Sequence, residues 1–136
     1  VRKTGDSIIA AVDQSDYFYD SLAYGIKLKS DQKMSIYFVL GVLMSEYVQS
    51  YHDKISNNKG KTFAKVLLQN LEKLPFPDLD LKNASAKEAH DRIAKLVKEL
   101  NEKSVAESEK AKDKILEINQ TVKRMFSSGG AGKKAA

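Results

Sequence analysis

A chain of 136 residues is long enough for one domain with its own hydrophobic core. It has no cysteine, which excludes disulfides and thiolate metal sites, and its longest near-continuous apolar run, Ile36 to Met44, is too short to span a membrane. The net charge of +5 favours polyanionic partners only slightly. We expect a cytoplasmic protein without membrane contact. Because no initiator methionine or signal peptide precedes Val1, we also expect a piece of a longer chain.

The N-terminal third is expected to supply strands. Residues 7–12 (SIIAAV) form a short apolar run typical of a buried strand, although the two alanines leave a helix open. Residues 13–21 are polar and aromatic, as in a loop. In residues 22–28 the larger apolar side chains alternate with small or basic ones, which predicts a half-buried strand.

A central helix is expected from Met34 to about Asp53. Apolar residues lie almost all round its first half and along one face of its second half. Ser30 and Asp31 are N-cap candidates. A basic loop with one glycine follows at residues 57–61, and the Leu-Pro-Phe-Pro phrase at 74–77 ends the next short helical turn.

Residues 85–126 contain neither glycine nor proline and are rich in alanine, lysine, glutamate and leucine, so they are expected to be helical. Ser85 and Glu88 match a capping box. Two apolar stripes are separated by polar residues at 104, 107 and 108, which predicts two helices that turn there and pair antiparallel. These helices are also a candidate surface for self-association.

Together, these elements predict an α+β fold. A small mixed sheet would pack on the central apolar helix, and a C-terminal antiparallel helix pair would follow. The expected division is a mixed target-recognition region at residues 1–82, the helical pair at 83–126 and a disordered low-complexity tail at 127–136.

No catalytic or metal-ligating pattern is visible in the sequence. Asp78, Asp80 and Lys82 suggest a nuclease magnesium site, but such a site needs its carboxylates on separate strands, whereas these are nearly adjacent. His52 and His90 lack the spacing of metal ligands. We therefore expect no catalytic residue, no metal and no cofactor in this chain.

The segment from Asn57 to Lys65 is the candidate binding site. Lysines can neutralise phosphates, asparagine amides can pair with adenine edges, and a glycine lets the backbone approach closely. An ordinary solvated loop is the alternative, and the residues alone favour it. The candidate DNA-binding residues are Lys54, Asn57, Asn58, Lys59, Gly60, Lys61 and Lys65, with Arg2 and Lys3 at the N-terminus.

Five phrases of the chain carry a resemblance to a known family: RKTGD (Arg2 to Asp6), YFVLGVLMSEYVQSYH (Tyr37 to His52), GKTF (Gly60 to Phe63), LPFP (Leu74 to Pro77) and INQTVKRMF (Ile118 to Phe126). They resemble the C-terminal specificity domain of TaqI-like enzymes, which are adenine-specific DNA methyltransferases and related fused restriction-modification enzymes. Three phrases depart from the family pattern: Met44 replaces an asparagine, Phe76 replaces an isoleucine, and the last phrase stands where the family usually has Ile-Asp…Val…Leu-Tyr-Gly.

The resemblance implies a target-recognition module of a type II or IIG modification or restriction-modification enzyme. Its partners would be duplex DNA and a separate catalytic methyltransferase domain of the parent chain. That domain would flip the target adenine and methylate it from S-adenosylmethionine. The alternatives are a domain of a type I restriction specificity subunit and a non-catalytic helical protein-interaction module.

Overall fold

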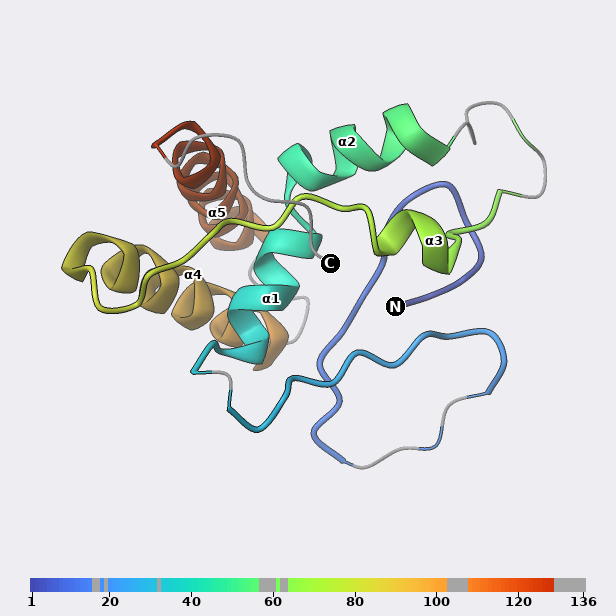
Figure 1. Ribbon diagram of the computed structural model, residues 1–136, viewed down its shortest axis with the longest axis horizontal. Helices are drawn as coiled ribbons and strands as arrows, with labels where there is room; N and C mark the ends of the chain where they lie inside the picture. The colour runs from blue at the N-terminus through green and yellow to red at the C-terminus, as the bar shows by residue number, and fades with distance from the viewer. Residues whose placement is uncertain are drawn as a thin grey trace.

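The computed structural model describes residues 1–15, 18, 20–31, 33–56, 61, 64–102 and 108–128. Among these residues α1 packs chiefly on α4, α4 packs on α5, and α2 contacts α1, α3 and α5 (Figure 1). None of the described helices has the length and apolar character needed to cross a membrane. The helices are α1 (Ile36–Leu43), α2 (Glu46–Ser56), α3 (Leu68–Leu71), α4 (Ala84–Glu102) and α5 (Ser108–Ser128).

The predicted α+β fold, with a small mixed sheet on the central helix, is wrong. The described residues are mostly helical and contain only two isolated antiparallel bridges, Arg2 with Ala23 and Thr4 with Lys65. Gly5, with a φ of +115°, bends the N-terminal segment just after the second bridge, so neither pairing extends into a ladder. Residues 8–14 and 24–29 run without a turn or bend, but no backbone hydrogen bond joins them to each other.

The predicted single helix from Met34 to Asp53 is broken in two at Ser45. This serine is 1% exposed; its Oγ donates to the Val42 carbonyl at 2.6 Å and accepts from the Val48 amide at 3.4 Å. The Glu46 amide donates to Oδ1 of Asn119 in α5 at 2.9 Å. A serine that competes for backbone groups, together with a tie to another helix, ends α1 and redirects the chain into α2.

Two helix starts also differ from the prediction. α1 is capped by Ser35, whose Oγ accepts from the Tyr37 amide at 3.2 Å. α4 begins after Asn83, whose Oδ1 accepts from the amides of Ser85 and Ala86 at 3.0 and 3.2 Å. Both residues are good N-caps; Ser35 lies closer to its helix than the predicted Ser30 and Asp31, whereas Asn83 lies two residues before the predicted Ser85.

The hydrophobic core is centred on α1, whose sequence IYFVLGVL carries no charge. Phe38 and Val42 are fully buried, and the ring of Phe38 meets that of Phe76 edge to face at 5.9 Å. Gly41 marks the closest approach to α4. A Cβ there would lie 2.7 Å from Cγ2 of Ile93 and 2.9 Å from Cγ2 of Val97, so only a glycine lets the two helices come this close.

α4 and α5 pack against each other in antiparallel orientation. Arg92 binds Glu117 through two hydrogen bonds of 2.6 and 2.9 Å, and Lys114 binds Glu99 at 2.6 Å, so residue numbers rise in one helix as they fall in the other. The buried stripes that face each other are Ile93, Leu96 and Val97 of α4 with Ile118 and Val122 of α5.

One hydrophobic cluster joins the two ends of the chain. Ile8, Val48 and Leu74 belong to the same cluster as Ile93 and Val122.

The expected division of the chain at residue 82 stays a prediction. Of the predicted tail, residues 127 and 128 complete α5, and residues 129–136 lie outside the described part of the chain.

We predict that Gly41→Ala destabilises the protein by about 1–2 kcal/mol. Alanine improves helix propensity by up to about 1 kcal/mol, but the added methyl overpacks the contact with α4 at a typical cost of about 1–3 kcal/mol. Urea unfolding monitored by circular dichroism measures the difference. Ser50→Ala, at an exposed position of α2, is the control and should change stability by less than about 0.5 kcal/mol. A Gly41→Ala variant as stable as the parent would show that α1 does not need this close approach.

His52 is a buried polar residue that neither sequence motif nor fold explains. Its side chain is 0% exposed, and both ring nitrogens lack a hydrogen-bond partner among the described residues. Burial lowers the pKa of His52, and the Asp53 carboxylate 4.0 Å away opposes this shift only in part. The imidazole is therefore neutral in the folded protein.

We predict that the free energy of unfolding falls as the pH is lowered from about 7.5 to 5.5, with a slope of up to about 1.4 kcal/mol per pH unit. The unfolded chain takes up a proton at His52 near its ordinary pKa of about 6.5, whereas the folded chain does so only at lower pH. His52→Leu should remove this slope, and it should be at least as stable at pH 7.5 because no polar nitrogen is left unpaired. Equal slopes in the two proteins would exclude His52 as the source.

Candidate nucleic-acid interface

Two basic segments that lie far apart in the sequence are joined by backbone hydrogen bonds. The Val66 amide donates to the Lys3 carbonyl at 2.8 Å, and the Gly5 amide donates to the Ala64 carbonyl at 2.9 Å. Between these bonds Thr4 lies opposite Lys65. We call residues 2–5 and 64–66 the basic stem, because they carry Arg2, Lys3 and Lys65.

The basic stem is also held by residues 22–24. The Lys3 amide donates to the Leu22 carbonyl at 2.9 Å, and the Tyr24 amide donates to the Val1 carbonyl at 2.7 Å. The Lys3 ammonium lies 4.5 Å from the centroid of the Tyr24 ring, a cation–π geometry. Backbone contacts on two sides therefore fix the position of the stem.

The structure places some of the predicted DNA-binding residues together. Arg2 and Lys65 are exposed in the basic stem and Lys3 is half-buried there. Lys61 is exposed three residues before the stem, and Lys54 is exposed in the last turn of α2. The other predicted residues, Asn57, Asn58, Lys59 and Gly60, lie outside the described part of the chain.

Most of these cations carry charge that the protein does not neutralise. Arg2, Lys3, Lys54 and Lys61 make no ion pair with a carboxylate in the described ranges, whereas Lys65 does have an interaction partner. Side-chain cations that pair with no carboxylate can bind the phosphates of a nucleic acid. Of these cations, Arg2 and Lys3 lie in the basic stem with Lys65, whereas Lys54 and Lys61 lie outside it.

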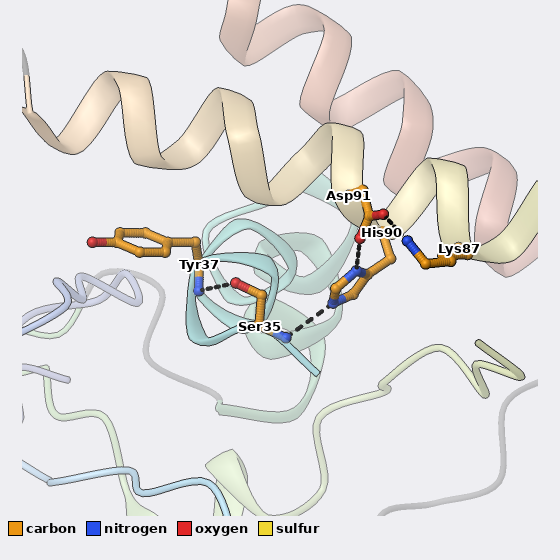
Figure 2. A network of polar contacts seen from close by, with 5 residues as sticks. All are labelled: Ser35, Tyr37, Lys87, His90 and Asp91. Atoms are coloured by element: carbon orange, nitrogen blue, oxygen red, sulfur yellow. Dashed lines mark hydrogen bonds and ion pairs between the residues drawn. The ribbon is translucent and has the colours of Figure 1, made fainter. Parts of the chain in front are cut away.

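A second polar network contains a serine, a histidine and an aspartate (Figure 2). His90 Nε2 accepts from the backbone amide of Ser35 at 2.9 Å, and Nδ1 lies 2.8 Å from Oδ1 of Asp91. A ring nitrogen that accepts carries no proton, so the hydrogen is on Nδ1 and is donated to Asp91. Hydrogen bonds from Lys87 and then His90 lower the pKa of the Asp91 carboxyl.

This network anchors α1 and does not activate a nucleophile. Ser35 binds His90 through its backbone amide, and its hydroxyl caps α1 at Tyr37 (Figure 2). The hydroxyl of a catalytic serine would instead donate to the imidazole. His90 thus ties the start of α1 to α4. In the described ranges no three His, Asp or Glu side chains are grouped as metal ligands would be, and this includes Asp78 and Asp80.

Comparison with family models identifies the family of this chain. The model that matches is described as the TaqI-like C-terminal specificity domain, and the match covers residues 1–76. This is more than half of the chain, so the chain belongs to that family. The resemblance inferred from the sequence phrases is confirmed, and it points to DNA recognition in a restriction-modification methyltransferase. No curated protein and no solved structure matches the chain.

We predict that Gly5→Ala loosens the basic stem and costs about 1–2 kcal/mol of stability. The φ of +115° is unfavourable for any residue with a Cβ, and a Cβ at this position would lie 2.8 Å from Nη2 of Arg2. Hydrogen exchange at the Val66 amide, which donates to Lys3, should become faster. Gly25→Ala is the control, because Gly25 is exposed and has no positive φ. Equal exchange in both variants would contradict a stem fixed by Gly5.

Proposed function

We propose that this chain is the DNA sequence-recognition module of an adenine-specific DNA methyltransferase or of a fused restriction-modification enzyme. The family match to residues 1–76 carries the proposal, since the same residues include the whole basic stem. The catalytic domain would be a separate part of the parent protein. It would bind S-adenosylmethionine and methylate the adenine, and the present chain would supply no catalytic group and no cofactor site.

In this proposal the basic stem contacts the DNA backbone. Arg2, Lys3 and Lys65 lie on two chain segments that are hydrogen-bonded to each other, and Lys61 is exposed nearby. Contacts from such cations to phosphates fix the register and orientation of a protein on the duplex but carry no sequence information. The stem would therefore position the module, and other groups would read the bases.

Base reading is assigned to Asn57 and Asn58. An asparagine amide can donate to N7 of adenine and accept from its N6 amino group in a bidentate pair, which makes it a specific reader of that base. Both residues come directly after α2, which ends at Ser56, and the basic stem begins again at Ala64.

The catalytic step imposes a further requirement on the module. A methyltransferase acts on a base that has been turned out of the helix, and this costs a few kcal/mol of stacking and pairing free energy. A module that grips the duplex beside the target supplies binding free energy for that distortion. The cations of the stem are suited to such a grip because they bind DNA without depending on its sequence.

We predict that Lys61→Ala together with Lys65→Ala weakens duplex binding equally for all sequences. In titrations between about 50 and 200 mM salt, the slope of log affinity against log salt should fall in magnitude by about 0.9 for each phosphate that the variant no longer binds. Fluorescence anisotropy with labelled duplexes measures both quantities. The reason is that each lysine bound to a phosphate releases counterions from the DNA.

Lys110→Ala with Lys112→Ala is the matched control, since these lysines are exposed on α5, outside the family match. This control removes the same charge and should leave the salt slope unchanged. An unchanged slope in the Lys61/Lys65 variant would show that the stem is ordinary solvated surface. If the unsubstituted chain binds no duplex, that result would instead favour a helical protein-interaction module.

A further inference from the structure

An apolar groove of about 850 Å³ lies between two non-helical segments. Residues 9–13 and 22–27 form its walls, and α1 contributes Val39 and Leu43 to its floor. Ile9, Leu22 and Ile26 all line the groove, yet they are 41, 58 and 46% exposed. Exposed apolar side chains that gather in one groove are typical of an interaction surface, whereas single ones scattered over a protein are not.

The groove also presents unpaired main chain. Residues 24–29 run without a turn or bend, and within the described ranges residues 25–29 form no backbone hydrogen bond. The opposite wall is straight over residues 8–14; of these residues Ile8 uses its amide for Oε1 of Gln49 at 3.0 Å and Ile9 uses its carbonyl for the Arg2 amide. A straight segment with free N–H and C=O groups is a template for another strand.

The wall that residues 22–27 form has the sequence pattern of a strand with one covered face. Leu22, Tyr24, Ile26 and Leu28 alternate with small or basic residues. Such an alternation is expected where one face is buried, but Leu22 and Ile26 are about half exposed. The described chain thus contains a strand-like segment whose apolar face is only partly covered and whose backbone edge is open.

We propose that this groove binds an extended peptide segment that adds as a β-strand beside residues 25–29. Backbone hydrogen bonds to this edge would hold the peptide, and its apolar side chains at alternate positions would cover Ile9, Leu22 and Ile26. Arg2 and Lys27 line the groove, are exposed and pair with no described carboxylate, and they outnumber Asp13, the acidic residue that lines it. The complementary partner is therefore a strand with an acidic residue at one end.

The groove chemistry distinguishes this partner from the DNA proposed for the basic stem. Nucleic acid would bring charged phosphates against Ile9, Leu22 and Ile26, which costs free energy because charges lose water there. A helix satisfies its own backbone groups and would leave the edge of residues 25–29 unpaired. Peptide binding requires neither DNA nor a catalytic domain, so the inference does not rest on the proposed function, although both use Arg2.

A display library of random peptides of about nine residues, close to the upper length of common strands, tests the proposal on the full chain. The enriched peptides should have apolar residues at alternate positions, an Asp or Glu at one end and no internal proline. Leu22→Lys with Ile26→Lys should reduce their affinity by at least about tenfold. Both positions are exposed, so the variant should fold, as circular dichroism and urea unfolding can establish.

Leu116→Lys is the matched control, because Leu116 is 56% exposed on α5 and does not line the groove; it should leave affinity unchanged. Lys27→Glu should weaken acidic-ended peptides, and a peptide with lysine in place of its acidic residue should bind this variant better. Single N-methylation along the best peptide should reduce affinity at every second position, since only alternate amides of an added strand face the edge.

Three results would overturn the proposal. The first is an enrichment that yields no peptide, or only peptides whose affinity for the Leu22/Ile26 variant equals their affinity for the unsubstituted chain. The second is N-methylation without a period of two residues. The third is a concentration-dependent dimer in sedimentation that Leu22→Lys with Ile26→Lys abolishes, which would make a second copy of this chain the occupant.

Discussion

The close contact of Gly41 with Ile93 and Val97 is the constraint on which the rest of the structure depends. It lets α1 lie against α4 with no side chain of its own at the crossing, so that Phe38 and Val42 are fully buried. His90 holds the start of the same helix through the Ser35 amide. With α1 fixed along its length on the helical pair, every segment that enters or leaves α1 has a defined starting point.

The binding surface is built on this support by backbone contacts. α2 leaves α1 at Ser45, where the Glu46 amide is tied to Asn119 of α5, and it leads to the predicted basic loop. The chain then returns to pair with the N-terminal segment in the basic stem. Main-chain groups make these joints, and the Lys3 ammonium adds a contact with the Tyr24 ring.

The sequence predicted what depends on local pattern and missed what depends on distant partners. The apolar helix, the two C-terminal helices and the family phrases are all visible as periodicity or composition. The predicted sheet is wrong because the alternation of Leu22 to Leu28 shows that a segment suits a strand, but not that a neighbour exists. The break at Ser45 depends on Asn119, 73 residues from Glu46. For the candidate site, Lys54, Lys61 and Lys65 are exposed, and their DNA-binding role stays a prediction. Of the three, Lys65 is joined to the segment of Arg2 and Lys3 through a pairing that no local pattern specifies.

The packing of α1 on α4 also orders events during synthesis. α1 leaves the ribosome well before α4, because residues 44–83 separate the two helices. Until α4 has emerged, the apolar faces of Phe38, Val42 and Gly41 have no cover, and transiently exposed surfaces of this kind are prone to aggregation. The family-matched stretch that contains α1 is thus made before α4, the helix that covers it.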